Sequence, residues 1–159
     1  MIEQVCLNEL LLESAKEIFE TMVFMDLAEC TEPAENAEDC ALLGTITFKG
    51  ALEGCLAFCC SVPCARAIAM NMLGIDTSEE IAEEDVCDAI GEICNMVMGS
   101  VKKRLAESAG NLEVSIPSVV SGRQLKNNMG EGSHKTTVKI NIEDEYVTEL
   151  SLLYHENSN

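Results

Sequence analysis

Three polar side chains repeat at helical spacing near the middle of the chain. Asp88, Glu92 and Asn95 are separated by four and then three residues. In a helix of 3.6 residues per turn these side chains share one face. A carboxylate can pair with a cation, and an amide can both donate and accept a hydrogen bond. The pattern indicates a polar face that a partner can meet, but a face that only meets water has the same spacing, so both interpretations stay open.

Two glycines accompany this polar face. Gly91 flanks it and Gly99 lies within it, and neither carries a side chain that would block a partner. Packing of another helix against the glycines is the alternative reason for their presence. Glycine costs about 1 kcal/mol relative to alanine inside a helix, and asparagine is also unfavourable there. Because the sequence departs from helix preference at these positions, we take the face as a candidate site.

A long helix from about residue 78 to 108 is expected to carry these residues. Thr77 and Glu80 fit a capping box at its start, and Gly110 fits a stop after its end. Opposite the polar face runs an apolar stripe that must face the core, formed by Val86, Ile90, Ile93, Cys94, Val97 and Val101.

The remaining segments predict an α+β fold for a single domain over residues 1–159, with a mainly antiparallel sheet and two long helices packed on one face. The first helix is expected over 7–24, with Asn8 as its cap and a core face that includes Leu7, Leu11, Ala15, Ile18 and Met22. A short helix is expected from Pro63 to Gly74. Alternating or apolar patterns predict strands at 41–48, 51–60, 112–116, 138–142 and 148–154, and loops at 29–39 and 121–134.

The charge balance excludes several classes of partner. Ten Lys and Arg residues face twenty-eight Asp and Glu, for a net charge of −18. Without a basic patch, binding to nucleic acid or to an anionic membrane is not expected, whereas a protein partner or a small cationic ligand is favoured. A charge that only maintains solubility is the alternative. No apolar run is long enough to span a bilayer, and the acidic start is unlike a secretory signal, so we expect a cytoplasmic protein.

Nine cysteines require an interpretation. Without a secretory signal they are expected to stay reduced and to fill the core. No C-x-x-C motif is present, and the densest group should divide between the two faces of a strand, so no metal site is predicted. A cysteine-dependent metalloprotein remains a rival interpretation. The group comprises Cys55, Cys59, Cys60 and Cys64.

A family resemblance rests on the polar helix face together with a distant proline. The pattern Asp88-x3-Glu92-x2-Asn95, followed after twenty-one residues by Pro117, resembles the signature of the CheC/CheX/FliY phosphatases of bacterial chemotaxis. The order of elements and the chain length are also similar to those of the family. CheC-like members carry the Glu-x2-Asn pair on both long helices, whereas the first helix here has Lys16 in place of the asparagine. A single site is most similar to the CheX-like members.

The resemblance implies a substrate, a mechanism and an assembly. The substrate is a phosphorylated CheY-like receiver domain that carries its own Mg²⁺, so no metal or cofactor of this chain is required. Asn95 would orient the attacking water and Glu92 would contact the receiver's active-site lysine. Asp88 would touch the partner or only solvate the helix, and Pro117 would be structural, breaking an edge strand or forming a bulge. The fold would be CheC-like, and two copies would form a homodimer by exchange of sheet strands.

Two alternatives remain open at this point. The same fold can act as a non-catalytic module that binds a receiver in a two-component pathway, and phosphate release separates that function from a phosphatase. A generic α+β domain with an accidental motif is the other alternative.

Overall fold

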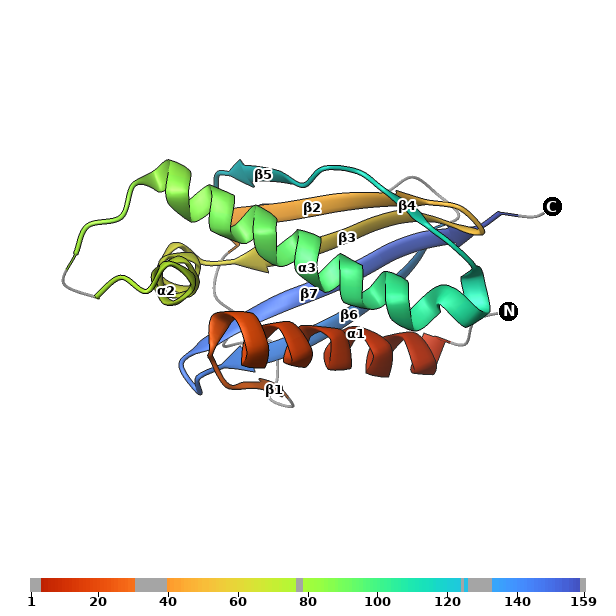
Figure 1. Ribbon diagram of the computed structural model, residues 1–159, viewed down its shortest axis with the longest axis horizontal. Coiled ribbons are helices and arrows are strands. Elements are labelled where there is room, and N and C mark those ends of the chain that lie inside the picture. The colour runs from red at the N-terminus through yellow and green to blue at the C-terminus, as the bar shows by residue number, and fades with distance from the viewer. Residues whose placement is uncertain (1–3, 31–39, 77–78, 124, 126–132, 158–159) are drawn as a thin grey trace.

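The computed structural model of the chain describes residues 4–30, 40–76, 79–123, 125 and 133–157. Residues 31–39 of the loop predicted at 29–39, much of the loop predicted at 121–134, and Thr77 of the predicted capping box lie outside these ranges. Glu29, at the start of the first predicted loop, belongs instead to a strand. Figure 1 shows a sheet with helices packed on one of its faces, which confirms the predicted α+β architecture.

Within these ranges, seven strands form one antiparallel sheet in the order β1-β6-β7-β3-β2-β4, with β5 also paired to β2. Each predicted strand is present, although neither β1 nor β5 was anticipated and the 112–116 segment contributes only two residues. The strands predicted at 41–48 and 51–60 are confirmed, and they pair as a hairpin with Leu42 opposite Cys60 and Phe48 opposite Gly54. The strands are β1 Leu27–Glu29, β2 Leu42–Lys49, β3 Leu52–Cys60, β4 Glu113–Val114, β5 Ser118–Ser121, β6 His134–Ile142 and β7 Tyr146–Glu156.

Two long helices lie side by side across the sheet (Figure 1). The first, α1 (Gln4–Ile18), packs over β6, and α3 (Glu83–Ala109) packs over β2 and β3. A third helix, α2 (Val62–Leu73), starts at a Ser61 cap and ends at Gly74 in a left-handed conformation, close to its predicted bounds. The two long helices and the inward side chains of the strands enclose the apolar core.

The first helix differs from its prediction at both ends. It starts at Gln4, so Asn8 lies inside it and is not the cap. At its other end the chain continues into a π-helical segment, Phe19–Val23. Because π-helical bonds widen the turn, the core face continues every fourth residue through Phe19 and Val23, and Met22 is exposed.

The start of α3 also differs from its prediction. The helix begins at Glu83 after Ala82, which gives no side-chain cap, so a capping box that ends at Glu80 does not start it. Carboxylates at Glu83, Glu84 and Asp85 occupy the first turn, where they complement the positive end of the helix dipole. The stop at Gly110 is confirmed.

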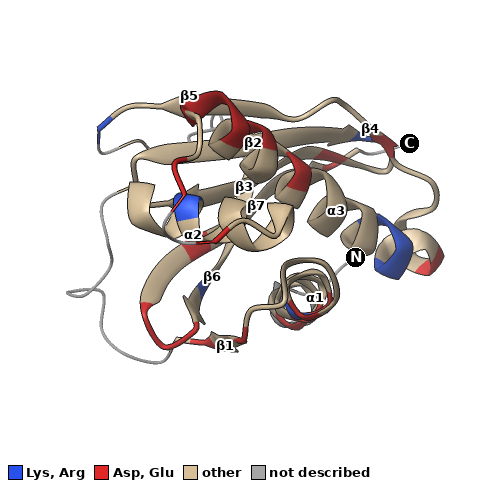
Figure 2. Cartoon of the chain, turned by 60° about the vertical axis from the view of Figure 1, so that its left-hand side comes forward, with Lys and Arg blue, Asp and Glu red and all other residues tan. Residues whose placement is uncertain are grey.

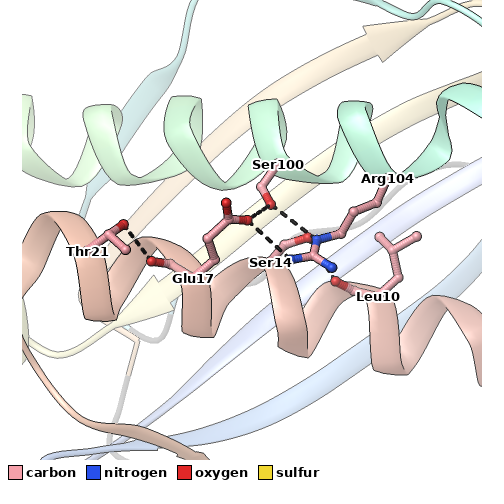
Figure 3. Close-up of polar contacts among 6 residues, drawn as sticks. All are labelled: Leu10, Ser14, Glu17, Thr21, Ser100 and Arg104. Carbon is pink, nitrogen blue, oxygen red and sulfur yellow. Dashed lines mark hydrogen bonds and ion pairs between the residues drawn. The ribbon is translucent and has the colours of Figure 1, made fainter.

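A polar cluster joins the two long helices (Figure 3). The Ser100 hydroxyl donates a hydrogen bond of 2.6 Å to Glu17 Oε2. The Arg104 guanidinium contacts the same oxygen at 3.2 Å. Hydrogen bonds from Ser100 and Arg104 lower the pKa of the Glu17 carboxyl, so the carboxylate form is favoured. The cluster fixes α3 against α1 on the side away from the sheet.

The cysteines partly follow the prediction. Cys60, Cys64 and Cys94 are buried in the core, as expected for reduced cysteine that packs like a small hydrophobe. The expectation that all nine stay reduced is wrong for Cys40 and Cys59, which form a disulfide. The β2–β3 hairpin brings their Cα atoms to 5.4 Å, within the range that a disulfide spans.

Candidate active site

The polar face predicted on the long helix is an exposed stripe of α3. Asp88, Glu92, Asn95 and Gly99 are all exposed, and we call these four residues the stripe. Every residue predicted for the opposite, core-facing stripe is buried. The core packing of α3 therefore determines which side chains it presents to solvent. Since Glu92 and Asn95 lie one turn apart, a partner can meet both at once.

Pro117 lies beside the stripe although it is distant in sequence. Phe48 pairs with Val114 and Thr45 pairs with Ser118, so β2 has two residues between these pairs and the facing chain has three. The extra residue makes a bulge at the edge of the sheet, where a proline without an N–H is tolerated. Pro117 lies in this bulge, and its ring lies next to Gly91 of α3.

Gly91 is placed differently from the other site residues. It is buried, and a Cβ atom there would lie 3.6 Å from Pro117 Cγ and from Val119 Cγ2. Its neighbour is thus the bulged chain rather than a helix. At Gly99, by contrast, an added Cβ would meet nothing within 4 Å, so only Gly99 leaves open space on the stripe.

These elements enclose a shallow hollow of about 420 Å³ between α3 and the bulged chain. Two of the stripe residues and the distant proline line the same surface, and Asn95 follows Glu92 by one turn at its side. A partner that contacts Glu92 and Asn95 would also lie over this hollow. Its lining residues are Cys87, Asp88, Gly91, Glu92, Pro117 and Val119.

The thiol of Cys87 is the one strong nucleophile type in the lining. Burial raises its pKa, and the carboxylates of Glu83 and Asp88 raise it further. Cysteine chemistry requires the thiolate, which a lowered pKa provides. The raised pKa therefore disfavours Cys87 as an attacking thiolate.

Sequence reasoning missed several residues at this surface. Cys87 and Val119 line the hollow, and Ile116 is 87% exposed beside Pro117. The alternation of the 112–116 segment predicts that Leu112 and Ile116 face the same side, and Leu112 is indeed buried. The bulge turns the side chain of Ile116 to the opposite side of the strand, and the proline that follows Ile116 is the sequence signal for that change.

A larger hollow of about 520 Å³ lies where α2, the start of α3 and the end of β5 meet. Arg66, Arg123 and Glu83 contribute its charged groups, and none of the stripe residues lines it. Within the described ranges, no three His, Cys, Asp or Glu side chains are grouped as metal ligands would be. None of the helices in those ranges is both long and apolar enough to cross a membrane.

A comparison with known protein families identifies the family of this chain. The family model described as "Chemotaxis phosphatase CheX" matches residues 42–141, well over half of the chain. The chain belongs to the CheX family. The matched region begins at β2 and includes the whole of α3, the bulge and most of β6, and thus every residue of the candidate site.

Individual relatives agree with this assignment. The CheY-P phosphatase CheX of Thermotoga maritima is 31% identical over 86 residues, which are 54% of this CheX-family chain and 55% of the relative. The match thus spans only about half of that relative's length.

Solved structures share the fold over nearly the whole chain. The crystal structure of the chemotaxis protein CheX from Vibrio vulnificus has a TM-score of 0.79 at 24% identity, covering 98% of this chain and 100% of that one. A CheX-CheY-BeF3-Mg²⁺ complex from Borrelia burgdorferi has a TM-score of 0.74 at 15% identity, with coverage of 98% and 100%. At these identities the similarity establishes the fold.

Proposed function

We propose that this chain is a phosphatase that hydrolyses the aspartyl phosphate of a CheY-like response regulator. The observation that carries the proposal is the exposed Glu92 and Asn95 pair on α3, beside a hollow that the distant Pro117 helps to form. Membership of the CheX family supports the reaction class. The complex of a structural neighbour with CheY, BeF3 and Mg²⁺ supports a receiver as the partner.

Asn95 supplies the chemistry in this proposal by holding a water in line with the phosphorus. The water oxygen forms a bond to phosphorus while the bond from phosphorus to the aspartyl oxygen breaks, and the water's proton passes to solvent. Products are inorganic phosphate and the free aspartate carboxylate. An amide suits this task because it offers a donor and an acceptor without adding charge next to an anionic group. The Mg²⁺ belongs to the regulator, so the chain needs no metal ligands of its own.

Glu92 fixes the position of the regulator by pairing with its active-site lysine, and Asp88 lies one turn away as a further contact. Replacement of Glu92 by alanine is expected to weaken the binding of a BeF3-loaded receiver about tenfold or more, because a charge-assisted contact is lost. The exposed carboxylate supports no core packing, so the fold should not change. Titration monitored by fluorescence measures the affinity, and an unchanged Kd would contradict the docking role.

The direct test of the reaction is phosphate release from a receiver charged with acetyl phosphate and Mg²⁺, with and without this chain. Acceleration at catalytic amounts of the chain is expected. Binding to the phosphorylated receiver without acceleration would instead favour the non-catalytic module. If the chain neither binds that receiver nor accelerates phosphate release from it, the proposal is rejected for that receiver.

We also propose that the chain forms a homodimer through its sheet. Of the two C-terminal strands, β6 lies nearer the edge of the sheet, because β7 lies between β6 and β3. β1 is short and pairs with β6 only at residues 140–142, so it covers only part of that side of the nine-residue strand. A strand that is only partly covered at the edge of a sheet favours pairing with another strand. Light scattering should give about 34 kDa, twice 17.2 kDa, and a species of a single chain's mass would contradict the dimer.

A further inference from the structure

The charge along α3 changes sign between its two ends. Its N-terminal half carries five carboxylates, whereas the C-terminal half carries two lysines, Arg104 and a single carboxylate, Glu107. Figure 2 shows red segments at the start of α3, a blue one near its end and red again after it. In a chain of net charge −18, two adjacent lysines beside the candidate site are unusual. The carboxylates are Glu83, Glu84, Asp85, Asp88 and Glu92, and the lysines are Lys102 and Lys103.

The two lysines extend the stripe rather than another face of the helix. At 100° per residue, Lys102, Lys103 and the four stripe residues fall within an arc of about 100°. Lys102 lies seven residues beyond Asn95, a rise of about 10 Å along the helix. Gly99 stands between them without a side chain, so a flat partner surface can contact both ends.

A second hollow, of about 300 Å³, lies at this end of α3. Both lysines line it, which places two ammonium groups around one shallow surface. Its lining residues are Gly99, Lys102, Lys103, Ala106, Gly110 and Asn111.

The lysines differ from the neighbouring arginine in their contacts. The Arg104 guanidinium is engaged with Glu17 and Ser100. Among the residues that the structure describes, neither Lys102 nor Lys103 has a hydrogen bond or an ion pair. Lys103 affects Glu17 only through space, as the weakest of the causes that act on that carboxyl's pKa. Because the two lysines have no partner among the described residues, they are available to pair with groups of a docked protein.

We propose that this second hollow receives an acidic element of the receiver's surface and thereby fixes the direction in which the receiver lies along α3. The inference rests on the proposed function. In one orientation along α3, a cation of the receiver meets Glu92 and carboxylates of the receiver meet the two lysines, so the charges are complementary. In the reverse orientation like charges meet, which disfavours it. The correct orientation brings the phosphoryl group to Asn95, and the lysines act as positioning residues about 10 Å or more away.

The test reverses both charges in one variant, Lys102→Glu with Lys103→Glu. A control variant, Lys16→Glu with Lys49→Glu, changes the net charge equally on the helix α1 and the strand β2. Initial rates of phosphate release are measured against the concentration of phosphorylated receiver at low and at high salt. For the α3 variant KM should rise about tenfold at low salt with kcat little changed, and the rise should shrink at high salt. The control should keep its KM close to that of the native chain.

Several results would overturn the proposal. An unchanged KM, an equal rise in the control, or a loss confined to kcat would each reject a docking role for the lysines. If the native chain binds a BeF3-loaded receiver but releases no phosphate, the catalytic proposal fails and the same variants are compared by Kd, with the same tenfold expectation. If the native chain does not bind that receiver at all, both proposals fall together.

Discussion

Replacing Asn95 by alanine should lower the rate of phosphate release by a factor of about 10²–10³, or roughly 3–4 kcal/mol in the transition state. The amide is the one stripe group that can orient a water by donating and accepting at once, and alanine can do neither. The side chain is exposed and opposite the core face of α3, so its loss creates no cavity. Alanine is also the better helix former, which should keep α3 intact.

Two further variants make this result specific to Asn95. Glu107→Ala alters another exposed residue of α3 outside the stripe and should keep the native rate. Asn95→Asp keeps the shape but places a negative charge beside the phosphoryl group, so it should also lose most of the activity. Circular dichroism and thermal melts of all three establish that the fold survives. Full activity of the alanine variant would remove Asn95 from the mechanism.

Sequence patterns were most informative where periodicity alone determines the structure. The apolar stripe from Val86 to Val101 predicts which face of α3 is buried, and hence that Glu92 and Asn95 point to solvent. The hairpin of β2 and β3 and the bounds of α2 follow equally from local signals, namely alternation, Pro63 and Gly74. In each case the residues that decide the outcome are close together in the chain.

The sequence-based predictions were wrong where the structure depends on contacts between distant residues or on a change of helix type. Met22 is exposed because the π-helical segment changes the residues per turn, which a fixed period does not anticipate. Ile116 turns outward at a bulge whose extra residue is evident only from the pairing with β2. The disulfide likewise joins two cysteines that are 19 residues apart in sequence, Cys40 and Cys59, and only the end of the hairpin brings them together.

The candidate site combines both kinds of information. Spacing predicts the polar face, but only the fold shows that Gly91 is buried under Pro117 while Gly99 is open. The same holds for Lys102 and Lys103, which are adjacent to each other and to Arg104 in the sequence. Their position on the stripe follows from the packing of α3, and their availability follows from the separate engagement of Arg104.

Among Gly→Ala substitutions at the described glycines, Gly54→Ala should lower the free energy of unfolding most. Gly54 lies in β3 between Phe48 of β2 and Tyr154 of β7. An added Cβ would overlap the carbonyl oxygen of Leu153 and lie 2.8 Å from Tyr154 Cα. These are backbone atoms of an interior strand, so no side-chain rotation relieves the overlap. We expect a loss of about 3 kcal/mol or more in the free energy of unfolding, measured by urea denaturation.

Gly99→Ala is the matched control, because the same methyl group meets nothing within 4 Å there. It should stabilise the chain by about 1 kcal/mol through helix propensity. A Gly54 variant as stable as the native chain would contradict the close approach of β3 and β7. Since β3 lies beneath α3, Gly54→Ala should lose activity together with folding, whereas Asn95→Ala loses activity alone. That difference separates the residues that build the surface from the residue that performs the chemistry on it.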